Sequence, residues 1–134
     1  MLIRILKERT RLEKKILIVD DEEDIRNSIK MLVETMGYEV KAVDDGNRAI
    51  DLLKKEKFDL MLLDMLMPKI SGLATLEKIR ADSKIKNQKV VFLTVVSLSQ
   101  AGEDIMKRLK PAGYIEKPID NVVFKKTIKK IVES

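Results

Sequence analysis

Cysteine and histidine are both absent from this 134-residue sequence. Their absence excludes disulfides, thiolate nucleophiles, Cys/His zinc sites, Ser-His-Asp triads and histidine-based proton relays. Aromatic residues are scarce, with no Trp, two Tyr and three Phe, so little is available to stack on nucleic-acid bases. No apolar run approaches the roughly 18 residues of a membrane span, and the N-terminus lacks the pattern of a secretory signal. The lack of cysteine fits a cytoplasmic protein, which is the location that we expect.

The net charge of +5 is concentrated near the N-terminus. Residues 1–15 hold six basic and two acidic residues, which leaves only +1 for residues 16–134. The pI of about 9.3 therefore reflects a basic leader, and the body of the chain gives little support for a nucleic-acid partner. We expect a basic N-terminal extension over residues 1–14, helical only in part or with a partner, and one domain over residues 15–134.

Short apolar runs alternate with segments that have apolar residues at helical spacing. Strands are predicted at residues 16–19, 38–43, 58–63, 90–93 and 114–115. Helices are predicted after residues 20–24, around 49–53, near 71–80, at 98–109 with an interruption at Gly102, and around 123–132. This alternation indicates an α/β fold, a doubly wound parallel sheet of five strands with five helices on its two faces. The more polar run at 38–43 suits an edge strand, whereas runs one, three and four read as central.

Polar side chains stand where these strands end. Asp20 and Asp21 follow the first strand, Asp64 the third, Thr94 the fourth and Lys117 the fifth. In an open parallel sheet, ligands bind beyond the carboxyl ends of the strands, so these groups are expected at one edge. Three carboxylates crowded together need a counter-charge, and Mg²⁺ prefers such oxygen ligands. A lysine and a hydroxyl suit a phosphoryl group, and a carboxylate can itself act as the nucleophile.

The sequence resembles the receiver domain of two-component response regulators over residues 15–133. The matching motifs are Asp20-Asp21 after Ile-Leu-Ile-Val, Asp64 in Leu-Leu-Asp-Met-Leu-Met-Pro, Gly72, Thr94 after Val-Val-Phe-Leu, and Tyr114-Ile-Glu-Lys117-Pro118. The resemblance implies a flavodoxin-like sheet with strand order 2-1-3-4-5.

The resemblance also implies a chemistry for the cluster. Asp64 would accept a phosphoryl group from a histidine kinase or a phosphotransfer protein. Asp21, Asp64 and the backbone carbonyl of Leu66 would bind Mg²⁺ directly, and Asp20 would act through a metal-bound water. The chain would then be a signalling module and not an enzyme, apart from catalysing its own phosphorylation and dephosphorylation.

The same resemblance implies a conformational switch. Lys117 would pair with the phosphoryl group, Thr94 would hydrogen-bond to it, and Tyr114 would be the rotating aromatic residue. Pro118 would follow a cis peptide bond that aims Lys117. Output would pass to an unknown protein through the face made by the fourth helix, the fifth strand and the fifth helix. A homodimer is left open as a further partnership.

Each residue also has a simpler interpretation. Asp20 and Asp21 suit a helix N-terminus, Thr94 suits any strand, Lys117 suits a surface, and Tyr114 suits a half-buried strand position. The basic face of the last helix is either solvated or a docking surface; its lysines are Lys125, Lys126, Lys129 and Lys130.

Three other functions compete with the signalling receiver. A phosphorylation-independent scaffold would share the fold, and a nucleic-acid binder would depend on the basic leader. A phosphohydrolase would need a general acid where Leu66 stands.

The chain also departs from the family at Val95, where a small residue is usual and where bulk would narrow access to the site. The resemblance places Leu66 and Val96 beside the path of a hydrolytic water, and these apolar side chains predict a long-lived phosphoryl group.

Overall fold

The computed structural model describes residues 14–95 and 100–133. Five parallel strands form one sheet in the order β2-β1-β3-β4-β5. Their bounds are β1 Lys15–Val19, β2 Glu39–Val43, β3 Leu60–Asp64, β4 Val90–Thr94 and β5 Gly113–Glu116. The predicted strand order and the edge position of the second strand are both confirmed.

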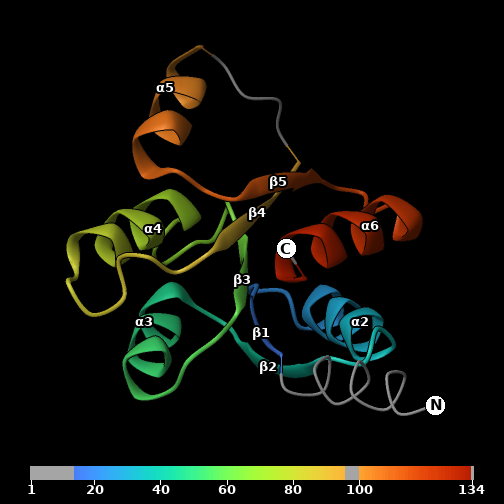
Figure 1. Cartoon of the computed structure of the whole chain (residues 1–134). Coiled ribbons are helices and arrows are strands. Elements are labelled where there is room, and N and C mark those ends of the chain that lie inside the picture. Colours follow the sequence, from blue (N-terminus) through green and yellow to red (C-terminus); the bar gives the residue numbers. More distant parts are fainter. Residues whose placement is uncertain (1–13, 96–99, 134) are drawn as a thin grey trace.

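Four helices of the described part connect these strands and a fifth follows β5, and together they cover both faces of the sheet (Figure 1). Their bounds are α2 Glu23–Glu34, α3 Gly46–Lys55, α4 Gly72–Ala81, α5 Gln100–Leu109 and α6 Asn121–Val132. Helices α3, α4 and α5 lie on one face, and α2 and α6 lie on the other (Figure 1). None of the described helices combines the length and the apolar character needed to cross a membrane.

The two faces of the sheet carry two hydrophobic clusters. Alternate residues of β1 show the division: Leu17 and Val19 pack toward α3, α4 and α5, whereas Ile16 and Ile18 pack toward α2 and α6. This follows from the period of two along a strand, which sends neighbouring side chains to opposite faces. Because β1, β3 and β4 are buried on both faces, their sequences are almost purely apolar.

The structure corrects one local prediction. Helix α5 runs without a break through Gly102, so the predicted interruption is wrong. A single glycine in a helix costs about 1 kcal/mol, which the packing of Leu109, Ile105 and Met106 on the core offsets. The predicted start of this helix at Leu98, the side chain of Val96 and the predicted leader over residues 1–13 lie outside the described residues.

Candidate functional site

Three aspartates meet at the carboxyl edge of the sheet, as predicted. The parallel register sets Val19 beside Leu63, so Asp20 and Asp64 leave adjacent strands at the same level. Carboxylate oxygens of Asp20, Asp21 and Asp64 all lie within 4.8 Å of one another. Asp20 is fully buried and Asp64 is 6% exposed, whereas Asp21 is open to solvent. The cluster thus has a buried inner wall and one accessible side.

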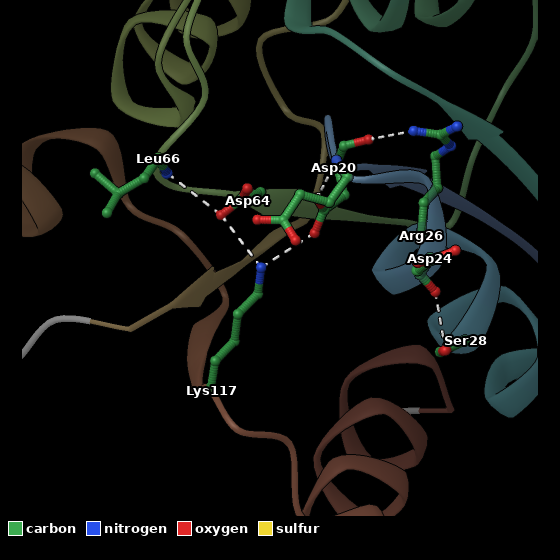
Figure 2. Close-up of polar contacts among 8 residues, drawn as sticks. Asp20, Asp24, Arg26, Ser28, Asp64, Leu66 and Lys117 are labelled. Carbon is green, nitrogen blue, oxygen red and sulfur yellow. Dashed lines mark hydrogen bonds and ion pairs between the residues drawn. The ribbon is translucent and has the colours of Figure 1, made fainter.

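Lys117 closes the cluster from the fifth strand. Its Nζ lies 3.1 Å from Oδ2 of Asp20 and 3.5 Å from Oδ1 of Asp64, between the two carboxylates (Figure 2). Its backbone N–H donates to the carbonyl oxygen of Thr94 at 2.7 Å, which ties the end of β5 to the end of β4. The peptide bond between Lys117 and Pro118 is cis, as the resemblance implied.

Asp20 is held by more than its ion pair. Its Oδ1 accepts a hydrogen bond from the backbone N–H of Glu22 at 2.9 Å, just before α2. The guanidinium of Arg26 donates to the backbone carbonyl of Asp20 at 2.8 Å (Figure 2). The helix-terminus interpretation of Asp20 is therefore compatible with a role in the site. Sequence reasoning missed Arg26, since nothing in its position one turn into α2 signals a contact with the chain before the helix.

The loop after β3 fixes Asp64. The backbone N–H of Leu66 donates to Oδ1 of Asp64 at 3.3 Å. The N–H of Gly72 donates to the carbonyl of Met65 at 3.0 Å, which brings the start of α4 against the end of β3. A Cβ on Gly72 would lie 2.4 Å from the carbonyl oxygen of Asp64, so only glycine fits at this approach. Ser71 caps α4 by accepting from the N–H of Ala74 at 3.1 Å.

The electrostatics of the cluster favour a cation. Burial raises the pKa of Asp64 to about 6, Lys117 opposes this shift, and the charge of Asp20 adds to it. Three ionised carboxylates and one ammonium leave the cluster two charges short of neutrality. Its ligand atoms are all oxygens, which is the donor set of a hard divalent cation such as Mg²⁺.

The two residues predicted to act as a switch lie on neighbouring strands. Thr94 is 1% exposed at the end of β4, whereas Tyr114 on β5 is 51% exposed. Tyr114 pairs in register with Phe92, two residues before Thr94. With about half of its surface exposed, Tyr114 fits the simpler interpretation of a half-buried strand residue, and its ring is accessible to solvent in this structure. Val95, where the chain departs from the family, is 63% exposed, and Leu66 is 55% exposed.

The response regulator receiver domain matches residues 16–129 of the chain. The chain belongs to this family. It is 35% identical to chemotaxis protein CheY-3 of Vibrio cholerae over 127 residues, covering 89% of this chain and 92% of that protein. It is also 35% identical to chemotaxis protein CheY of Pseudomonas aeruginosa, over 89% of this chain and 96% of that protein. Among solved structures, CheY4 of Vibrio cholerae superposes with a TM-score of 0.81 at 28% identity, over 88% of this chain and 98% of CheY4.

Membership of this family assigns the chain to two-component signal transduction. Receiver domains are signalling proteins that interact with histidine kinases and output proteins, and they bind Mg²⁺ in a pocket of aspartates. In this chain, Asp20, Asp21 and Asp64 form a group of aspartates that could hold such an ion.

Proposed function

We propose that this receiver domain accepts a phosphoryl group on Asp64 and thereby changes the surface that it offers to an output protein. The observation that supports this most is the position of Lys117, whose ammonium reaches both Asp20 and Asp64. A structural lysine would need only one carboxylate partner. A lysine that lies between two carboxylates, with a third carboxylate nearby, is suited to bind an anionic group attached to Asp64.

In the proposed reaction, a carboxylate oxygen of Asp64 attacks the phosphorus of a phosphohistidine on the donor protein. The bond from phosphorus to the imidazole nitrogen breaks, and the imidazole leaves with the electron pair. Asp21, Asp64 and the carbonyl of Leu66 would hold Mg²⁺, with Asp20 acting through a bound water. When bound, Mg²⁺ supplies positive charge that offsets the negative charge of the transferred group.

Residues of the chain would bind the transferred phosphoryl group and respond to it. Lys117 would neutralise one phosphoryl oxygen, and the backbone N–H of Leu66, now 3.3 Å from Asp64 Oδ1, lies where it could donate to another. Thr94 would turn its hydroxyl toward the new anion, and Tyr114 would move from its exposed position into the space released. Such a switch is a population shift, so the phosphoryl group must bind one packing better than the other.

The proposal extends to partners and location. The donor would be a histidine kinase or a phosphotransfer protein, and the output protein would bind the face formed by α5, β5 and α6. Exposed Tyr114 and Lys130 line one hollow on this face, whereas Lys125, Lys126 and Lys129 lie toward the end of α2. We also propose residues 15–134 as the receiver unit, residues 1–14 as a separate basic extension, and a cytoplasmic location.

Intact-mass spectrometry after incubation with acetyl phosphate and Mg²⁺ tests the reaction. The wild type should gain the mass of one phosphoryl group, and no adduct should form without Mg²⁺. Asp64→Asn should abolish it, and Asp21→Ala should reduce it at least tenfold. Asp51→Asn on α3, which removes one exposed carboxylate that is not part of the cluster, is the matched control and should leave the adduct unchanged.

Two outcomes would contradict the proposal. An adduct that survives in Asp64→Asn would place the acceptor elsewhere. A wild type that binds Mg²⁺ but forms no adduct with acetyl phosphate or with any phosphorylated donor domain would instead favour a phosphorylation-independent scaffold.

A further inference from the structure

A second polar pocket lies at the opposite edge of the sheet. It has a volume of about 430 Å³ and is formed by the segment from α3 to β3, the segment from α4 to β4, the chain just before β1, and Val132 at the end of α6. Asp59 and Lys89 of this pocket stand directly before β3 and β4, whereas Asp64 and Thr94 stand at the carboxyl ends of these strands. At about 3.3 Å per residue, the pocket is about 13 Å or more from the phosphoacceptor cluster.

The pocket is strongly basic. Five lysines line it, with two acidic residues; the lysines are Lys14, Lys57, Lys84, Lys86 and Lys89. Hydroxyl and amide groups of Ser83, Asn87 and Gln88 share the lining, and its floor includes the apolar residues Leu53 and Phe58.

The two acidic residues of the pocket are already engaged. Glu56 accepts from Lys15 at 2.6 Å and from Lys41 at 2.7 Å, and these hydrogen bonds hold the pKa of its carboxyl below the usual value. Asp59 accepts the backbone N–H of Lys15 at 2.9 Å and lies 3.9 Å from Lys14 Nζ. Neither acid contacts the lysines of the two connecting segments.

Among the residues that the structure describes, three of the lining lysines have no side-chain hydrogen bond or ion pair, although the charge of Lys84 lies near enough to act on Asp82. The side chains of Lys57, Lys84 and Lys86 are exposed, and within residues 14–95 and 100–133 they make no ion pair or hydrogen bond. They also lie beyond the last turns of α3 and α4. The negative ends of these two helix dipoles already have basic residues in the last turn, Lys54 on α3 and Lys78 on α4. Capping of helix dipoles therefore does not account for them.

The segment that presents two of these lysines is pinned through its backbone. Arg80 on α4 donates to the carbonyl oxygens of Lys86 and Gln88, each at 2.8 Å. Oδ1 of Asp82 accepts the N–H of Lys84 at 2.9 Å. The Gln88 amide reaches across to the carbonyl of Phe58 at 3.1 Å and joins the two segments. The fixed backbone holds these cationic residues around one hollow, so an arriving anion has to order only the lysine side chains.

We propose that this pocket binds a small anion that carries two or more phosphoryl groups. Several ammonium groups around one hollow match a ligand with several closely spaced negative charges, and lysine binds phosphate as a point charge. The volume lies within the usual range for ligand pockets and exceeds what inorganic diphosphate fills. A nucleoside diphosphate or triphosphate would leave its uncharged part to contact the apolar floor.

Binding is tested by following backbone amide resonances during titration with inorganic diphosphate and, separately, with ATP. EDTA is present so that neither ligand bridges to the aspartate cluster through a metal. Saturable shifts are expected over residues 56–59 and 82–89. The variant Lys57→Gln/Lys84→Gln/Lys86→Gln should bind both ligands at least tenfold more weakly, about 1.4 kcal/mol.

Lys30→Gln/Lys125→Gln/Lys126→Gln on α2 and α6 is the matched control, because it removes the same charge from positions that do not line the pocket. At 0.15 M salt the Debye length is about 8 Å, so the control should change either affinity less than about twofold. If ATP binds more tightly than diphosphate, its nucleoside part contacts the apolar floor of the pocket. If the two bind equally, the pocket recognises the phosphoryl groups alone.

Four results would overturn the proposal. They are the absence of saturation by either ligand, shifts centred on Asp20 and Asp64 or on α6, equal weakening by the control variant, and equally tight binding of citrate. The last result would show a general polyanion site without a preference for phosphoryl groups.

Discussion

Replacing Asp64 by asparagine should stabilise the fold in the absence of Mg²⁺, although it removes the proposed phosphoacceptor. Burial raises the pKa of Asp64 from 3.8 to about 6, so the folded protein holds this proton more tightly than the unfolded chain does. Ionising Asp64 therefore costs stability at neutral pH. Asparagine has nearly the shape of the protonated acid and avoids the cost.

The size of the effect follows from the shift. A difference of about 2 pKa units corresponds to about 3 kcal/mol above pH 6, where both states are ionised. Below pH 3.8 both states are protonated and the cost vanishes, so the stability advantage of the variant grows as the pH rises from about 4 to about 6. At pH 5 the variant should show about half of its full stability advantage. Relaxation of the site lowers the full value, and we expect at least about 1 kcal/mol at pH 8.

Urea unfolding in EDTA at pH 5 and pH 8 measures this difference, with Asp51→Asn as the control for loss of one exposed charge. Added Mg²⁺ should stabilise the wild type more than Asp64→Asn and so narrow the gap, because it binds the folded cluster. If Asp64→Asn is less stable than the wild type at pH 8, or if the gap is the same at both pH values, the assigned electrostatic cost is wrong.

Three further predictions concern the close approach of α4 to β3, the segment before β5, and the lifetime of the phosphoryl group. Gly72→Ala should destabilise the fold by about 2 kcal/mol or more in urea unfolding, because its Cβ would lie 2.4 Å from the Asp64 carbonyl oxygen; unchanged stability would refute this close approach. Arg80→Ala should speed amide hydrogen exchange at residues 109–112, since the guanidinium donates to the carbonyl of Leu109 at 2.6 Å; unaltered exchange there would contradict it. Leu66→Asn should shorten the lifetime of the phosphoryl group, because an amide can orient a hydrolytic water and leucine cannot; an equal or longer lifetime would show that this side chain does not control hydrolysis.

The sheet and the positions of the site residues could be predicted because both follow from short-range patterns. A run such as Ile16–Val19, buried on both faces, must be a central strand, and the polar residue after it must stand at the sheet edge. Parallel register then brings Asp20 beside Asp64 whatever the length of chain between them. Exact strand ends were less predictable, as β5 begins at Gly113 and includes Glu116.

The contacts of long cationic side chains could not be predicted from sequence in the same way. Arg80 follows buried Leu76 by four residues, at the spacing of the core face of α4, and its guanidinium donates to carbonyls of the α5 end and of the segment before β4. Arginine can reach several acceptors at once, and which ones it finds depends on segments that only the folded chain brings together. The lysines near it show the opposite case. Their sequence pattern suggests only a solvated loop. In the folded chain, hydrogen bonds to the backbone of this loop hold Lys84 and Lys86 at the wall of the basic pocket.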